Sequence, residues 1–358
     1  MGMNTYAATT ARLDKFKGKI FRNALPRECL AKAGRQIEMP KNNSKTYVGR
    51  RYLHWGSTST DRNTMNRFFQ DGNGADRATA IANQHLTQEG VTGTPDSIVP
   101  VDTTVVIAQY DCLFGWTDVV QDTHEDDIKA EAVSQVATRV TFVNEMIIYG
   151  ALKACTNAYY GGTGTTVGTV NGKLTLGLIR KIVMNLQANH AESVTTMLKA
   201  SAYYGTDAVE EGYLVYCHTD LAPDIRDLPG FEPTVKYASG TPMPREIGKC
   251  EMFRFILSPD LPSIQNGGAA IGATNLYTTS GTSLDVYPII VVGKDAWSQL
   301  ALRGKSALDV TYFDAGEKTK TDPHGQRGSA GTIWWKAVLI ENNGWMAVAN
   351  VGRKNLPE

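Results

Sequence analysis

Apolar residues recur at spacings of three and four along one stretch of the chain. They are Ile128, Ala132, Val136, Val140, Val143, Ile147 and Ala151. This spacing places all seven on one face of an α-helix. It predicts a long helix from about Glu125 to Ala154, roughly 45 Å at 1.5 Å per residue. A second helix, from about Thr175 to Ala188, is predicted by the segment TLGLIRKIVMNLQANHA.

Two segments rich in β-branched and aromatic residues predict strands on either side of a polar stretch. The segments are TYVGRRYLHW, from Thr46, and TTVVIAQYDCLFGWTDVV, from Thr103. The polar residues between them, 56–100, amount to about 45 positions, too many for an ordinary connection in a compact domain. Phe68 and Phe69 lie in the middle of this stretch. We therefore expect it to become ordered against a partner.

The remaining pattern predicts a second α+β domain and a terminal hairpin. From Tyr213 to Leu302, short apolar runs alternate with turns rich in proline and glycine. Near the C-terminus, apolar residues alternate on both sides of Asn343-Gly344, a type I′ turn signal. At the other end, residues up to about Met39 predict a basic arm with one short helix in NALPRECLAKAGRQIE.

Composition agrees with a soluble globular protein and sets limits on its class. The 358 residues are 42% hydrophobic and 20% charged, enough for about two domains. No apolar run approaches the ~20 residues that cross a bilayer, and the first residues lack the apolar region of a secretory signal. Five scattered cysteines without a C-x-x-C pair predict reduced, buried thiols rather than a disulfide or zinc framework.

The net charge of zero conceals an uneven distribution. Met1–His54 contains twelve Lys and Arg against three acidic residues, and the rest of the chain has the opposite excess of nine. Such a segment predicts an arm that binds something negative, either nucleic acid or the acidic body of another copy. We expect a neighbouring copy first and DNA second, with a merely solvated face as the alternative. The residues in question are Lys15, Lys17, Lys19, Arg22 and Arg27.

An acidic cluster around His124 is the strongest candidate for site chemistry. Its members are Asp118, Asp122, Glu125, Asp126 and Asp127. Asp122 is predicted to be a helix N-cap, with Glu125 completing a capping box and the other carboxylates facing the positive end of the helix dipole. A metal site is the alternative. Consecutive side chains point apart, which favours the start of a helix over metal binding.

The other motifs do not indicate catalysis. The turn GGTGTTVG lacks the lysine of a phosphate-binding loop, and the six histidines share no metal-ligand spacing. His218 follows Cys217 and could in principle activate a thiol, but a structural histidine is favoured. No catalytic, metal-binding or cofactor-binding residue is therefore predicted, and we expect a protein that is not an enzyme.

Several segments resemble one family, the major capsid proteins of tailed double-stranded-DNA bacteriophages. They are WTDVVQDTHEDDIKAEAVSQVA, the RDLPGF run from Arg226, KYAS at Lys236, VVGKDAW, and the Trp-rich C-terminal segment. The resemblance extends from about Pro40 to Val351, except for much of 56–100. It implies the Hong Kong 97-type capsid fold, an α+β architecture. None of these motifs is catalytic.

The resemblance also implies an organisation and a function. The implied parts are an N-terminal arm (1–45), an extended E-loop with flanking strands (46–118), a P-domain with a long spine helix (119–199), an A-domain (200–302), and a return to the P-domain with a C-terminal hairpin (303–358). The implied function is self-assembly, through hexamers and pentamers, into an icosahedral shell around double-stranded DNA. The expected location is the virion capsid, with the host cytoplasm during assembly.

Partners follow from the same resemblance. Portal and decoration proteins are implied, and no membrane. Some relatives carry a long N-terminal scaffolding segment that is cut away. Only about 40 residues precede the first strand here, too few for a domain of that kind. A separate scaffolding protein is therefore expected, with no large N-terminal truncation on maturation.

Some relatives also weld their subunits through an E-loop lysine. Residues 55–100 contain arginines but no lysine, and a guanidinium stays protonated and cannot act as the nucleophile. Non-covalent contacts through Arg62, Arg67, Phe68 and Phe69 are expected instead. Two rival interpretations stay open: an encapsulin-type shell around protein cargo, and a metal-dependent hydrolase built on DTHEDD.

Overall fold

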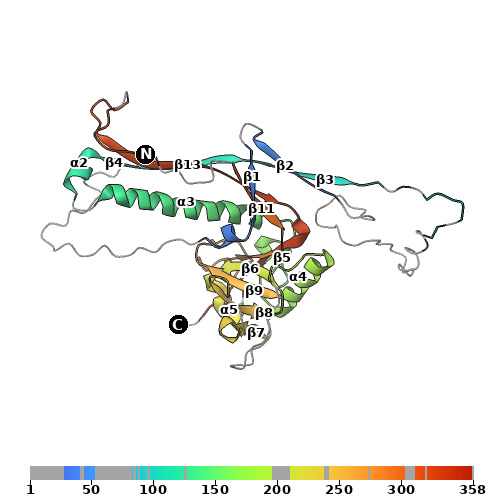
Figure 1. The fold of residues 1–358 in the computed structure, drawn as a ribbon. Helices are drawn as coiled ribbons and strands as arrows, with labels where there is room; N and C mark the ends of the chain where they lie inside the picture. The colour runs from blue at the N-terminus through green and yellow to red at the C-terminus, as the bar shows by residue number, and fades with distance from the viewer. Residues whose placement is uncertain are drawn as a thin grey trace. The chain divides into compact units, whose positions relative to one another are not determined.

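The structure consists of two compact units. The computed structural model describes residues 28–40, 44–52, 83, 86–87, 89–93, 95, 97–124, 127–195, 210–237, 242–272, 275–302, 311–318 and 321–356 (Figure 1). Unit 1 comprises Met1–Tyr47, Val105–Gly150 and Ser298–Leu339, and unit 2 comprises Val48–Thr104, Ala151–Trp297 and Ile340–Glu358. Each unit has its own core.

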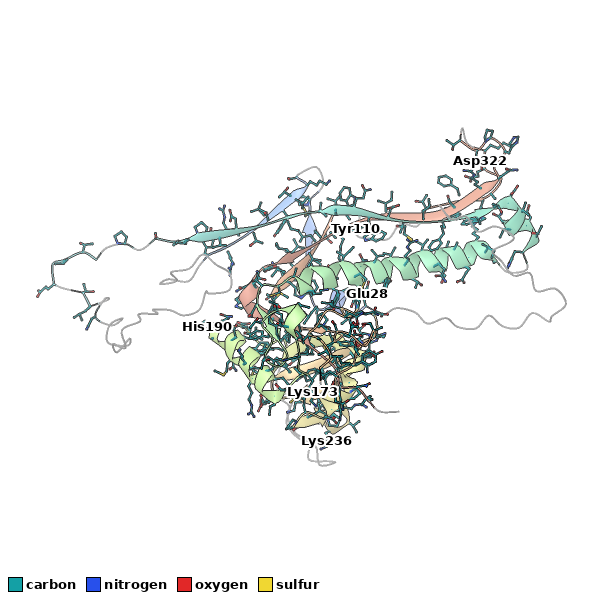
Figure 2. All side chains as sticks on the ribbon, turned by 180° about the vertical axis from the view of Figure 1, so that it is seen from behind. Glu28, Tyr110, Lys173, His190, Lys236 and Asp322 are labelled. Carbon is teal, nitrogen blue, oxygen red and sulfur yellow. The ribbon has the colours of Figure 1, made fainter. Side chains whose placement is uncertain are left out.

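A five-stranded sheet and a long helix make up most of unit 1. The sheet has the order β1-β11-β13-β12, and β4 also pairs with β13. Its strands are β1 (Arg35–Met39), β4 (Ala108–Thr117), β11 (Trp297–Leu302), β12 (Thr311–Phe313) and β13 (Arg327–Ile340). Helix α3 (Ile128–Lys153) runs alongside β4 and β13 (Figures 1 and 2). At 26 residues it is about 39 Å long.

The predicted apolar stripe of α3 packs against one face of this sheet. Ala132, Val136 and Val140 are buried with residues of β4 and β13 that share that face. On β4 and β13 these are Cys112, Trp116, Ala330 and Trp334, with Tyr110 and Phe114 partly buried beside them. Because strand residues alternate in direction, the other face of β4 and β13 points away from α3. The helix is therefore confirmed, together with the first part of its stripe. Further along, Ile148 and Leu152 are fully buried, whereas the predicted Ile147 and Ala151 are only half-buried.

The start of α3 differs from the prediction. Asp122 lies inside a separate short helix, α2 (Asp118–Thr123), whose N-cap is Thr117. The side chain of Asp127 accepts the backbone N–H of Ala130 at 3.0 Å and so caps α3. The prediction that Asp122 is the N-cap of α3 is wrong. Asp122 belongs to α2, which ends at Thr123, and α3 begins at Ile128. Glu125 and Asp126 lie outside the described residues.

The N-terminal part of unit 1 contains a strand that the hydrophobic pattern did not predict. Arg35–Met39, predicted as part of the arm, forms β1 and pairs in parallel with β11 from Arg35↔Ser298 to Met39↔Leu302. The predicted short helix is a single 3₁₀ turn, η2 (Leu30–Lys32). Met39 packs with residues of β11 and β13 in a second small core.

Unit 2 is built on a seven-stranded mixed sheet. Its order is β5-β14-β10-β6-β9-β8-β7. The strands are β5 (Ala158–Tyr160), β6 (Tyr213–His218), β7 (Phe231–Pro233), β8 (Glu246–Cys250), β9 (Phe253–Ser258), β10 (Tyr287–Val292) and β14 (Met346–Val351). The central strands are continuous apolar runs buried along nearly their whole length, the pattern of strands covered on both faces.

Two helices cover one face of this sheet. Helix α4 (Leu176–Ala188) begins at its N-cap Thr175, as predicted, and buries Ile179, Ile182 and Leu186. Helix α5 (Ala222–Arg226) adds Ile225 to the same core. Four further 3₁₀ turns lie in this unit: η3 (Val167–Thr169), η4 (Thr219–Leu221), η5 (Thr234–Lys236) and η6 (Asn343–Trp345).

The predicted C-terminal hairpin is wrong. Its two arms are strands, but β13 belongs to the five-stranded sheet and β14 to the seven-stranded one. Asn343 and Gly344 form η6 instead of a type I′ turn, and the side chain of Asn342 accepts the N–H of Gly344 at 2.9 Å. Neither residue has the positive φ that a type I′ turn requires. The Asn-Gly pair therefore lies where the chain leaves the five-stranded sheet and enters the seven-stranded one.

Candidate assembly surfaces

The residues that the sequence singled out for assembly lie outside the described residues. This holds for the arm residues Lys15, Lys17, Lys19, Arg22 and Arg27 and for the loop residues Arg62, Arg67, Phe68 and Phe69. The segments next to them are described, however. One strand lies on each side of the loop, and the two pair with each other. These strands and one face of the sheet in unit 1 carry apolar side chains that are exposed to solvent.

The first surface is the face of β4, β12 and β13 that points away from α3, hereafter the outer face. Leu113, Phe313 and Ile333 are 51–57% exposed on it. The register places Leu113 opposite Gly331 and Phe313 opposite Ser329. Small residues of β13 thus lie between the larger apolar side chains of β4 and β12. The side chain of Leu113 leans over Gly331, and on the same face the register places Ile333 opposite Asp111.

The second surface is a two-stranded ribbon formed by β2 (Thr46–Tyr52) and β3 (Pro100–Val106). The predicted strands on either side of the polar loop are thus present, and β4 continues the chain beyond Ile107. Val48, Tyr52 and Val106 are 50–61% exposed on the ribbon. A two-stranded sheet without a packed face is marginally stable in water.

One ion pair joins the ribbon strands. Arg50 donates to both carboxylate oxygens of Asp102, at 2.7 and 2.8 Å. The guanidinium lowers the pKa of Asp102, chiefly through the hydrogen bond, and the carboxylate raises the pKa of Arg50. Both side chains are exposed to solvent, where such a pair contributes little. The ion pair therefore helps to fix the alignment of β2 with β3. The exposed apolar residues of the ribbon can be buried only against another surface.

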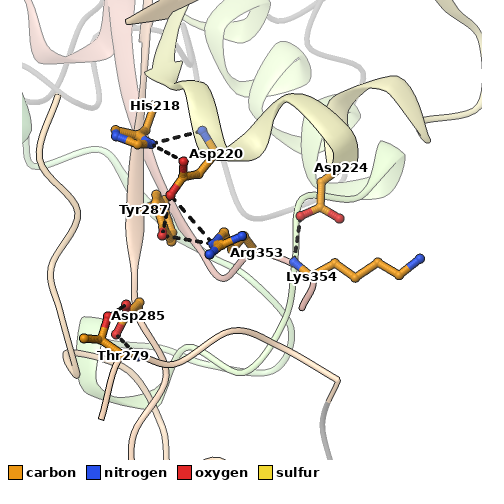
Figure 3. Close-up of polar contacts among 8 residues, drawn as sticks. All are labelled: His218, Asp220, Asp224, Thr279, Asp285, Tyr287, Arg353 and Lys354. Atoms are coloured by element: carbon orange, nitrogen blue, oxygen red, sulfur yellow. Dashed lines mark hydrogen bonds and ion pairs between the residues drawn. The ribbon is translucent and has the colours of Figure 1, made fainter. Parts of the chain in front are cut away.

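A polar cluster in unit 2 surrounds His218 (Figure 3). Its Nδ1 accepts the backbone N–H of Asp220 at 3.0 Å and caps η4. Tyr287 donates its hydroxyl to Asp220 at 3.1 Å, and Arg353 donates to the Tyr287 oxygen at the same distance. Burial raises the pKa of Tyr287 to about 12. His218 therefore has the structural role that was favoured, in a cluster that joins β6, β10 and the C-terminal segment.

Other members of the view in Figure 3 also secure the backbone. The buried carboxylate of Asp224 accepts the N–H of Lys354 at 2.8 Å. Asp285 accepts the hydroxyl of Thr279 at 2.6 Å and the N–H of Asn266 at 2.9 Å. These carboxylates hold turns and the end of the chain in place, which is a structural task.

The described residues do not assemble a reactive centre. All five cysteines are buried, as predicted. Burial raises the pKa of Cys155 to about 11 and those of Cys217 and Cys250 above their usual range. Such thiols are poor nucleophiles. Within the same residues no group of three or more His, Cys, Asp or Glu could hold a metal ion. None of the helices described there is long and apolar enough to cross a membrane.

Solved structures with the same architecture are phage capsids. The capsid of cyanophage Pam1 matches with a TM-score of 0.58 at 13% identity over 98% of each chain. The capsid of Ralstonia phage GP4 matches with a TM-score of 0.57 at 10% identity over the full length of both chains. Cyanophage P-SCSP1u gives a TM-score of 0.57 at 12% identity over 96% of this chain and 94% of its own. The chain has the fold of phage capsid proteins, and its mixed α/β content fits the Hong Kong 97 type.

A curated sequence relative agrees with this fold. The major capsid protein of Pseudomonas phage KPP21 is 24% identical over 204 residues, which cover 53% of this chain and 51% of the relative. The chain thus spans about half the length of the curated relative that it matches. No protein-family model matches the sequence. The predicted resemblance to phage major capsid proteins is confirmed.

Proposed function

We propose that this protein is the major capsid protein of a tailed double-stranded-DNA phage and that its copies assemble into an icosahedral shell. The observation that carries the proposal is the capsid fold over essentially the whole chain. The relative named as a major capsid protein supports it from the sequence side. The apolar outer face and the ribbon supply a physical reason for association, since large exposed apolar patches favour contact with another protein.

The parts of the subunit are assigned accordingly. Residues 1–45 would be the N-terminal arm, 46–118 the E-loop, 119–199 with 303–358 the P-domain, and 200–302 the A-domain. The ribbon β2–β3 supports the E-loop assignment, and α3 with β13 supports the P-domain. Strand β14 departs from this scheme, because it pairs with β10 in the seven-stranded sheet.

The proposal includes the partners of a working shell. Copies would meet in hexamers and pentamers, with DNA on the inner surface and with scaffolding, portal and decoration proteins. Arm contacts would come from Lys15, Lys17, Lys19, Arg22 and Arg27, and loop contacts from Arg62, Arg67, Phe68 and Phe69. Without a lysine in residues 55–100, the loop would hold its neighbours non-covalently.

Electron microscopy of the overproduced protein tests the proposal. Negative staining should show closed shells or curved lattice fragments, and a protein that stays monomeric at high concentration would contradict it. Denaturing electrophoresis of particles should give one band near 39 kDa, whereas a covalent ladder would refute the non-covalent loop. Particles from infected cells should contain DNA. An enzyme inside them would instead indicate an encapsulin-type shell.

A further inference from the structure

A buried carboxylate of α3 binds the backbone of the segment that follows the arm. Glu145 is 2% exposed. Its Oε1 accepts the N–H groups of Cys29 at 2.9 Å and Leu30 at 2.8 Å, and its Oε2 accepts that of Ala31 at 3.3 Å. Three successive backbone donors thus converge on one side chain more than a hundred residues away.

The 3₁₀ turn η2 depends on this acceptor. The first N–H groups of a helix have no partner within the helix, and Cys29, at the N-cap position of η2, provides no side-chain cap. Glu145 supplies the missing acceptor. Without it, three N–H groups beside the fully buried side chain of Leu30 would lose their partner, which is costly away from water.

A second side chain holds the same segment from the sheet. Gln299 of β11 donates its side-chain amide to the carbonyl oxygen of Ala31 at 2.6 Å. Its own oxygen accepts from Lys336 of β13. The chain then continues into β1, which pairs with β11. Residues 29–31, hereafter the arm root, are therefore fixed by both layers of unit 1.

We propose that Glu145 is an anchor that ties the arm root to the long helix and so fixes where the chain enters β1. Neither α3 nor the arm root can shift without the loss of three hydrogen bonds. The anchoring concerns the isolated subunit. Its consequence for shell assembly rests on the proposed function, because only there does the arm have to meet a neighbour in one fixed direction.

The charges around Glu145 give the anchor a pH dependence. Burial raises its pKa above the usual range, Glu28 adds to this, and the three N–H groups oppose it. Glu28 lies beside α3 (Figure 2), and Lys336 of β13 is the nearby cation. A raised pKa means that the closed arm root binds the proton more tightly than the open one. Protonation of Glu145 therefore adds stability to the closed arm root at low pH, and this addition is lost as pH rises through the raised pKa, while the three hydrogen bonds remain.

Peptide-resolved hydrogen exchange on the purified full-length subunit tests the anchor. In Glu145→Ala the amides of the arm root should exchange at least about tenfold faster, while those of β4 and β13 keep their wild-type protection. Glu145→Gln, which keeps an acceptor oxygen, should show a smaller acceleration. Glu131→Ala is the matched control, since Glu131 lies on the same helix and is exposed. Wild-type exchange of the arm root in Glu145→Ala would overturn the proposal.

Two further readouts separate the anchor from simple loss of folding and from the shell itself. After correction for intrinsic exchange, opening of the arm root should increase from pH 4 to pH 8 in the wild type and stay flat in Glu145→Gln. The same slope in both proteins would refute the role of the carboxylate. Particle formation is then scored separately. If wild-type protein makes no shell while the exchange result holds, the proposed function fails and the anchor stands.

Discussion

The two larger sheets of this protein differ in the fraction of their strand residues that is buried. In unit 2, β9, β10 and β14 are buried at every position. In unit 1, less exposed positions of β4 and β13 alternate with more exposed ones along much of each strand, and α3 packs with the less exposed face. A strand whose two faces are both covered buries all its side chains within its own subunit. A strand covered on one face leaves the side chains of its second face exposed to solvent or to a partner. Unit 2 thus supplies its own stability, and unit 1 presents a surface.

Truncating a core residue of unit 2 should have the largest effect. Phe255 of β9 is fully buried and meets Phe253 edge to face at 6.2 Å. Phe255→Ala should lower the free energy of unfolding by about 3–5 kcal/mol, measured by urea denaturation of the subunit. Phe313→Ala is the matched control on the outer face and should change it by less than about 0.5 kcal/mol. Equal losses would remove the contrast between the two sheets.

The covered face of the unit 1 sheet should be the next most sensitive. Gly328 of β13 lies against the buried indole of Trp116, and an added Cβ would overlap that ring. Gly328→Ala should therefore cost about 1–3 kcal/mol through overpacking. Gly150 of α3 has open space around its Cα, so Gly150→Ala should stabilise the helix by about 0.5–1 kcal/mol. Thermal unfolding of the two variants should shift in opposite directions.

The cap of α3 provides a smaller test. Asp127→Ala removes the acceptor of the Ala130 N–H and should lower the free energy of unfolding by about 1 kcal/mol. Asp122 lies in the last turn of α2, where a carboxylate faces the negative end of the helix dipole. Asp122→Ala should therefore be neutral or slightly stabilising. Greater sensitivity at Asp122 than at Asp127 in urea denaturation would contradict the observed helix boundary.

The outer face should show the smallest effect on the subunit and the clearest effect on assembly. The triple variant Leu113→Ser, Phe313→Ser and Ile333→Ser should leave subunit stability within about 0.5 kcal/mol per position. Particle yield, measured by sedimentation and electron microscopy, should fall sharply. Val235→Ser with Met184→Ser alters exposed apolar residues of unit 2 and serves as the control. Normal particle yield from the triple variant would mean that the outer face is not a contact.

Local patterns in the sequence predicted the helices and strands that form mainly because of residues close to one another in the chain. The first part of the α3 stripe, the start of α4 and strand β2 all lie close to the predicted positions. The cysteines were also predicted to be buried, and they are. Helical periodicity and β-branched composition act over a few residues, so one sequence suffices to detect them.

Only the tertiary structure decided which segments meet. An Asn-Gly pair between two apolar segments favours a hairpin locally, but β14 gains more partners beside β10 and β5 than β13 could offer it. Glu145 lies on the core-facing side of α3, and its partners are about 115 residues earlier in the chain. The exposure of Leu113 likewise depends on α3 packing with the opposite face of β4. These outcomes depend on long-range packing and solvent exclusion, which no short window of sequence contains.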